Sequence, residues 1–250
     1  MDPDGMAAGD PPYTKNNVNF VHFSCPTARS ITRTSGGTFT GAAAAANTSI
    51  SGEYAMNMQQ FEMLNNGAKA NYLFGRNVSM NSIQTQGLTI VNGSVQEGGR
   101  SSNSYFVSQD QYDYWSAGLG DPPADSKLGF GGGIPLIVDG MPFGAEKKFD
   151  ANGNMIQNSS AGYPFQNNAT VGKSILAFDG NGNFMIVSQQ NGVEGMTLDG
   201  IRDHLIGKGY TNAISFDGST SATLMRDNTI INSPNGRKNN SIPVGIQVHE

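Results

Sequence analysis

An acid and several hydroxyl side chains occur together where a predicted buried strand ends. The stretch 212–216 is a short, nearly continuous apolar run, which is typical of such a strand. Asp217 and Gly218, a turn-forming pair, end the run. The hydroxyl residues that follow are Ser219, Thr220, Ser221 and Thr223. A carboxylate can activate water or stabilise positive charge, so the stretch is a candidate catalytic loop; a plain polar hairpin loop is the alternative.

A predicted helix precedes this strand and helps to position the loop. Residues 195–210 have apolar side chains at helical spacing, and Thr197 is a suitable N-cap. Asp199 places negative charge at the positive end of the helix dipole, and Gly207 and Gly209 end the helix. The predicted order is therefore helix, turn, buried strand, acidic loop and a second strand.

The chain resembles the phosphodiester glycosidases in these segments. Members of that family start a helix with Gly-hydrophobic-Thr-Leu, carry a Leu-Asp-Gly-Gly-Gly-Ser-Ala-Thr loop, and then an Asn-Arg-Pro-Ser-like segment. The matching segments here are Gly195-Met196-Thr197-Leu198, Phe216-Asp217-Gly218-Ser219-Thr220-Ser221-Ala222-Thr223-Leu224 and Asn232-Ser233-Pro234-Asn235. Ser219 and Thr220 replace the second and third glycines of the family, so positive φ angles are less accessible there. The separated matches run from about Ala55 to Val248.

The resemblance implies further site residues outside the loop. The family has an active-site Asn in an Ala-Ile-Asn-Gly-Gly-Phe-Phe string, and Asn57 is the matching residue. Members often carry an Arg at the position of Asn168, so a cation that would hold phosphate is missing here. Lys173 is the first candidate to replace it, and Arg237 or Lys238 are the others.

The activity implied by the resemblance is hydrolysis of the C1–oxygen bond of a sugar-1-phosphate diester, on a sugar phosphate or a glycan. One carboxylate can suffice because a phosphomonoester leaves with little acid assistance. The implied catalytic residues are Asp217, Ser221 and Asn57. The implied substrate-binding residues are Gly218, Ser219, Thr220, Thr223, Lys173, Asn232 and Arg237. The alternative is a non-catalytic carbohydrate-binding or structural module, for example in a phage tail or a cell-surface assembly.

Composition predicts one α+β domain, mainly of antiparallel strands with a few flanking helices. The 250 residues are 37% hydrophobic and only 14% charged, and glycine is abundant. A net charge of −5 argues against nucleic-acid binding. The single cysteine, Cys25, excludes an internal disulfide, and no cofactor or metal site is predicted, since no His, Cys and Asp cluster at metal spacing. A homo-oligomer or larger assembly stays open.

The first residues predict a polar tail or linker over 1–19, followed by a single domain over 20–250. The tail has no basic start before an apolar core, so no signal peptide is predicted. No stretch is long and apolar enough for a membrane span. The compartment stays open, with virion-associated and extracellular places both considered.

Several strings predict turns rather than sites. Asn92-Gly93, Asp139-Gly140 and Asp227-Asn228 each follow a predicted strand, which indicates hairpins. Strings resembling the start of a calcium loop begin at Asp150 and Asp179, but both lack the Gly and Glu that such a loop needs, so hairpin turns are the better interpretation.

An aromatic cluster occurs in an irregular region of the chain. Its members are Tyr105, Phe106, Tyr112, Tyr114 and Trp115. Aromatic rings suit the apolar faces of sugar rings, so a sugar-stacking surface is one hypothesis. A core beneath a long loop is the other, and it is the more usual arrangement.

Overall fold

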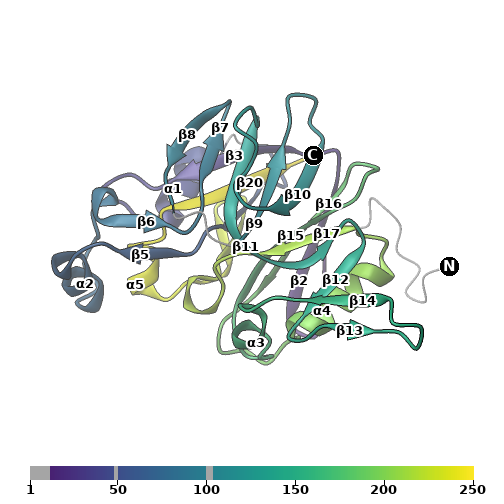
Figure 1. Cartoon of the computed structure of the whole chain (residues 1–250). Helices are drawn as coiled ribbons and strands as arrows, with labels where there is room; N and C mark the ends of the chain where they lie inside the picture. The colour runs from purple at the N-terminus through teal and green to yellow at the C-terminus, as the bar shows by residue number, and fades with distance from the viewer. Residues whose placement is uncertain (1–11, 48–49, 100–103) are drawn as a thin grey trace.

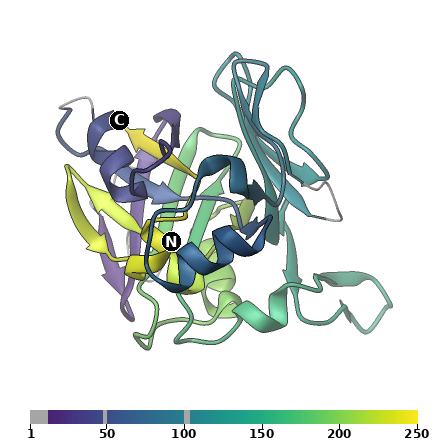
Figure 2. The ribbon, with the colours of Figure 1, turned by 90° about the vertical axis from the view of Figure 1, so that its left-hand side faces the viewer.

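The protein is described here by a computed structural model covering residues 12–47, 50–99 and 104–250 (Figure 1). Two sheets, mostly antiparallel, share a hydrophobic core. A ribbon of β5 (Phe61–Met63) and β6 (Ile83–Thr85) stands with helix α2 (Asn66–Leu73) at one side of the sheets, as Figures 1 and 2 show. This arrangement confirms the predicted α+β fold with antiparallel strands and flanking helices.

The larger sheet carries the strand that ends at Asp217. Its main path consists, in spatial order, of β1 (Tyr13–Lys15), β2 (Val18–Ser24), β16 (Asn183–Gln189), β15 (Lys173–Phe178), β17 (Asn212–Ser215), β11 (Leu128–Val138), β12 (Met141–Gly144), β14 (Met155–Ser159) and β13 (Lys148–Phe149). The first part of β11 also pairs with β7 (Thr89–Val91) and β9 (Tyr105–Gln109), which pair in turn with β8 (Ser94–Glu97) and β10 (Trp115–Leu119). Only β12 and β14 pair in parallel among the described strands.

The smaller sheet lies against one face of the larger one. It consists, in spatial order, of β19 (Thr229–Asn232), β18 (Leu224–Arg226), β4 (Tyr54–Asn57), β20 (Val244–His249) and β3 (Thr27–Thr32). Met56 and Ile246 of this sheet share a core cluster with Leu176 and Ile214 of the larger sheet. The strand β4 thus brings Asn57 to the interface between the sheets, beside the end of β17.

Helix α4 (Leu198–Gly207) covers the other face of the larger sheet. Its Leu198, Ile201 and Leu205 are fully buried and pack in a cluster with Ile175 and Ala213. Because neighbouring residues of a strand point to opposite faces, this burial makes β15 and β17 apolar on both sides. The predicted helix is confirmed: the Thr197 side chain accepts a hydrogen bond from the Gly200 N–H as N-cap.

The remaining helical segments are short. They are α1 (Phe39–Ala46), α3 (Tyr163–Gln166), α5 (Gly236–Asn239) and the 3-10 turns η1 (Met80–Ser82) and η2 (Ser219–Ser221). No helix among the described residues has both the length and the apolar character needed to cross a membrane.

The predicted turns are hairpins in the structure. Asn92-Gly93, Asp139-Gly140 and Asp227-Asn228 have positive φ at both positions and join β7 to β8, β11 to β12 and β18 to β19. This conformation matches the twist of paired strands. The calcium-loop-like strings also close hairpins, because the Asp150 and Asp179 carboxylates each accept hydrogen bonds from backbone N–H groups two and four residues ahead.

The predicted start of the domain is wrong by several residues. The sequence predicts a tail over 1–19, but Tyr13–Lys15 forms β1, which pairs with β2 from Val18 onward. The Tyr13 ring stacks on Phe20 with centroids 5.0 Å apart. Packing against the sheet therefore orders this polar segment, while residues 1–11 lie outside the described residues.

Candidate active site

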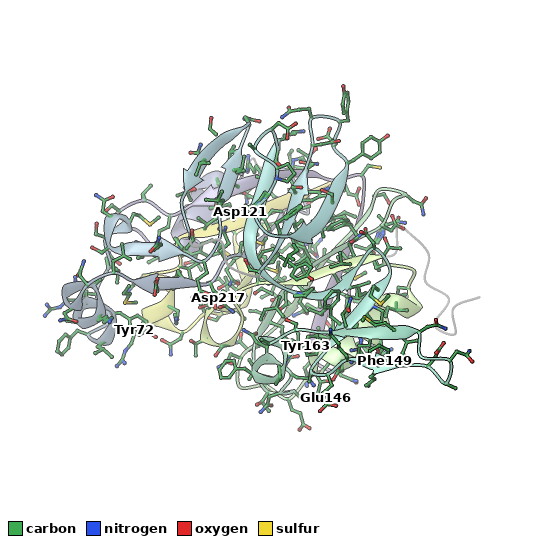
Figure 3. The ribbon with its side chains drawn as sticks, in the orientation of Figure 1. Tyr72, Asp121, Glu146, Phe149, Tyr163 and Asp217 are labelled. Carbon is green, nitrogen blue, oxygen red and sulfur yellow. The ribbon has the colours of Figure 1, made fainter. Side chains whose placement is uncertain are left out.

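The loop 216–223 leaves β17 at the centre of the molecule. Asp217 is the second residue after the strand, and its N–H donates to the carbonyl of Met58. Figure 3 shows Asp217 with Tyr72 of α2 to one side and Tyr163 of α3 to the other. The acidic loop is therefore held at the junction of the two sheets, directly after a buried strand.

Asn57 fixes the conformation of this loop. Its Nδ2 donates to the Asp217 carbonyl oxygen at 2.5 Å, and its Oδ1 accepts from the Thr223 N–H and from Ser174 Oγ at 2.8 Å each. Asn57 is 0% exposed. Both acceptor positions of its oxygen are used by the chain, so Asn57 positions the loop rather than orienting sugar hydroxyls from a cleft wall.

The Asp217 carboxyl is chemically perturbed. Burial raises its pKa from 3.8 to about 6, and the Ser221 hydroxyl and the Lys238 ammonium partly oppose this rise. Ser221 Oγ is buried and lies beside the Asp217 carboxyl. It forms no well-aligned hydrogen bond with any described residue. A carboxyl that titrates near neutral pH in a polar loop is a good candidate for acid–base or electrostatic work.

Lys238 is the cation that approaches this carboxyl. Its Nζ lies 4.7 Å from the centre of the Phe61 ring and 5.4 Å from that of Tyr72. It comes from α5, which contacts η2, and the Asn235 N–H before α5 donates to the Thr220 carbonyl. The side chains of α5, β5 and α2 therefore form one wall beside the loop.

Lys173 is the first cation that the sequence predicts for the site, but its ammonium is bound inside the chain. Lys173 is 0% exposed, and its Nζ donates to the carbonyls of Asn168 and Val171. Burial lowers its pKa to about 8. The ammonium is thus used to close the 168–172 loop, and Lys238 takes its place as the cation beside Asp217.

The other predicted site residues divide between the loop and its support. Gly218 is packed so closely that a Cβ there would lie 2.2 Å from the Gly172 carbonyl oxygen. Thr223 is buried, and its hydroxyl donates to the Ser221 carbonyl. Asn232 is also buried, with its Nδ2 donating to Ser188 Oγ. Arg237 is exposed on α5. These placements make Gly218, Thr223 and Asn232 structural supports.

Ser219 has a positive φ of 51° at a position where the resembling family has glycine. An L-residue pays a steric cost there that glycine avoids. We therefore expect Ser219→Gly to stabilise the protein by roughly 0.5–1 kcal/mol. Thr220→Gly, at a neighbouring position without positive φ, is the matched control and should lower stability. Thermal melts of both variants measure this; a lower melting temperature for Ser219→Gly contradicts it.

A pocket of about 290 Å³ adjoins the loop, and no sequence pattern indicates it. Gln60, Gln86 and Gln166 supply polar side chains to its wall. Gln166 is 4% exposed, and its Oε1 has no hydrogen-bond partner among the described residues. That oxygen lies 3.0 Å from where a Gly218 Cβ would be, so Gln166 connects the pocket with the acidic loop. The position of Gln166 beside the loop depends on where α3 packs, and the local sequence does not specify this packing.

The aromatic cluster divides into core and surface. Tyr105 packs edge-to-face on Phe143, and Trp115 packs on Phe184 with ring centres 4.6 Å apart. Tyr112 and Tyr114, in the turn between β9 and β10, are 81% and 69% exposed. The expectation of a core position therefore fits Tyr105 and Trp115, Phe106 is half-buried beside them, and Tyr112 and Tyr114 lie at the surface.

Comparisons with known proteins agree with this architecture. The model of the phosphodiester glycosidase family matches residues 66–249. The catalytic domain of zebrafish N-acetylglucosamine-1-phosphodiester alpha-N-acetylglucosaminidase, auto-inhibited by pro-peptide, has a TM-score of 0.56 and 14% identity, with 98% of this chain and 87% of that chain covered. Comparison with curated protein sequences gives no match.

Two further solved structures share the fold. A hypothetical protein from Synechocystis has a TM-score of 0.53 and 13% identity over 93% of this chain, which spans only 59% of that protein. A putative exported protein from Burkholderia pseudomallei has a TM-score of 0.54 and 10% identity, with 93% of this chain and 74% of that chain covered. The family match extends over more than half of the sequence and includes the acidic loop, so the chain belongs to the phosphodiester glycosidase family.

Proposed function

We propose that this protein hydrolyses the bond between C1 of a sugar and the oxygen of a phosphodiester. The observation that carries the proposal is the Asp217 carboxyl, whose pKa is raised to about 6, next to the Lys238 ammonium and the Ser221 hydroxyl. A carboxylate, a cation and a hydroxyl suit a substrate with a reacting carbon beside a phosphate. Membership of the phosphodiester glycosidase family supports the same reaction class.

The reaction requires one carboxylate in the proposed mechanism. The C1–oxygen bond breaks, its electron pair leaves with the phosphomonoester, and C1 acquires oxocarbenium character. The ionised Asp217 stabilises this positive charge and accepts a proton from the water that attacks C1. Lys238, the Ser221 hydroxyl and loop N–H groups bind the phosphate oxygens, whose charge increases as the bond breaks.

The 290 Å³ pocket is the proposed place of the sugar. Its volume is near the lower end of the range of about 300–1,000 Å³ for small-molecule sites. The Oε1 of Gln166, which has no hydrogen-bond partner within the described ranges, can accept a hydrogen bond from a sugar hydroxyl, while Gln60 and Gln86 supply further amide groups. Gln166 lies against the loop at Gly218, which supports a binding mode with C1 of the sugar directed toward Asp217.

The test is single-turnover hydrolysis of sugar-1-phosphate diesters as a function of pH. Since the ionised carboxyl is the active form, the rate should rise as the pH increases through about 6 and then level off. A rate that instead falls through pH 6 would assign Asp217 as an acid. Saturable binding of the diesters without turnover would favour a non-catalytic carbohydrate-binding module, the second candidate suggested by the absence of the family Arg at Asn168.

Lys238→Met tests the proposed phosphate contact. The variant keeps an unbranched apolar stem against Phe61 and Tyr72 but lacks the charge. We expect KM to rise about 10-fold and to respond less to added salt, because a screened ion pair has been lost. Lys173→Met is the contrasting variant: its ammonium is bound inside the chain, so it should lower thermal stability without changing the salt response. An unaltered salt dependence in Lys238→Met excludes the contact.

A further inference from the structure

A second, larger pocket lies at the other end of the sheets. It has a volume of about 510 Å³ and is formed by the β2–β3, β9–β10 and β15–β16 turns, with Lys127 just before β11. Figure 1 shows the β9–β10 and β15–β16 turns on the same upper side of the molecule, away from α5. Its aromatic, charged and amide lining residues are Tyr112, Asp113, Tyr114, Trp115, Lys127 and Asn181.

This pocket is separate from the Asp217 loop. Ile175 of β15 pairs with Ser215, close to Asp217, whereas the pocket residue Gly182 lies beyond the opposite end of β15. Asn212, five residues before Asp217, pairs with Phe178 at the end of β15, and the turn that contains Gly182 follows Phe178. At about 3.3 Å per residue of strand, the two places are on the order of 15 Å apart. A ligand in this pocket would therefore contact different residues from a substrate at the Asp217 loop.

The aromatic side chains are presented by an ordered turn. One Asp110 carboxylate oxygen accepts hydrogen bonds from the N–H groups of Tyr112 (2.8 Å) and Tyr114 (2.9 Å). Asp113 has a φ of 68° and forms an ion pair with Lys127. Trp115, the first residue of β10, packs on Phe184. These contacts fix the backbone that carries the two largely exposed tyrosines, so little backbone entropy is lost when a ligand binds.

The surrounding groups are polar and nearly balanced in charge. Asp113 and Lys127 neutralise each other, and Asn181 adds an amide. Aromatic rings with balanced donors and acceptors match the apolar faces and the hydroxyl groups of a pyranose, and they match an anionic ligand less well. We propose that this pocket binds uncharged sugar residues of a glycan, independently of the reaction at Asp217.

The chain contains one tryptophan, Trp115, which makes its fluorescence a direct reporter of the pocket. We expect saturable changes in its emission on titration with maltohexaose or chitohexaose. Tyr112→Ala and Tyr114→Ala should each weaken binding about 3- to 10-fold, the usual effect of losing one stacking ring. Phe74→Ala removes another strongly exposed aromatic ring, 74% exposed at the end of α2, and should leave the affinity unchanged.

Three outcomes would overturn the proposal. The first is that neither saccharide causes a saturable change in fluorescence up to about 10 mM, which corresponds to negligible affinity. The second is that the tyrosine variants bind with the same affinity as the unmodified protein. The third is that an apolar peptide saturates the pocket and neither saccharide does. Thermal melts confirm that each variant is folded. Because the assay measures binding alone, its result is independent of whether the protein hydrolyses glycosyl phosphodiesters.

Discussion

Asp217→Asn should reduce the single-turnover rate by at least ~100-fold while making the protein more stable at pH 8. The loss of rate follows from removing a preorganised negative charge that stabilises the transition state. Asparagine retains the size of aspartate, and the N–H and carbonyl of residue 217 still bond to Met58 and Asn57. The loop should therefore keep its conformation, and KM should change little.

The gain in stability follows from the raised pKa. Asp217 has a pKa of about 6 in the folded state against 3.8 as its ordinary value. The folded state therefore binds the proton more strongly, so the stability contributed by this group is fully present below pH 3.8 and is lost as the pH rises towards 6. At pH 8 the buried charge costs at most about 3 kcal/mol, which the neutral amide avoids.

The two measurements on this variant separate the possible roles of Asp217. Thermal melts at pH 4 and pH 8 should show that Asp217→Asn has its advantage mainly at pH 8. Asp139→Asn is a matched control, since Asp139 also follows a strand, as the first residue of a hairpin turn, and no part of the proposed chemistry uses it. A folded Asp217→Asn variant with a near-native rate would show that Asp217 only shapes the loop.

Local sequence predicted the elements around the site because their signals are local. Thr197 caps α4 through a hydrogen bond to a residue three positions away, and the Asn92-Gly93 turn needs only its own backbone angles. The emergence of Asp217 from a buried strand depends on an apolar run and a turn-forming pair. In each of these cases, the interaction that causes the structure lies within a few residues of sequence.

The features that could not be predicted from the sequence depend on packing between distant segments. Lys173 looked like an available cation, but its ammonium is enclosed by carbonyls of the preceding loop once β15 is buried on both faces. Gln166 faces the acidic loop only because α3 packs near Gly218. The polar segment 13–15 joins the sheet through a stacked pair of rings, Tyr13 and Phe20. None of these contacts has a local signature.

Asn57→Ala should have the largest effect on the fold among the variants considered. The substitution leaves the Thr223 N–H and the Asp217 carbonyl without their partners, and Ser174 also loses its acceptor. Each buried polar group left unpaired costs about 1–3 kcal/mol, and the cavity can admit water at some of them. We therefore expect a loss of about 3–5 kcal/mol in the free energy of unfolding, measured by urea titration.

The same substitution tests whether Asn57 acts through the loop. If Asn57 only positions Asp217, then Asn57→Ala should lower the rate by about 10- to 100-fold, because misplacing a catalytic group by about 1 Å has an effect of that size. It should also lower the apparent pKa of the pH–rate profile, since a loosened loop exposes the Asp217 carboxyl to water. Asn212→Ala is the matched control: Asn212 is a buried asparagine at the other end of β17 whose Oδ1 accepts the Asp139 N–H. That variant should lose stability and keep both the rate and the pKa, whereas a native pH profile in a folded Asn57→Ala variant would contradict the positioning role.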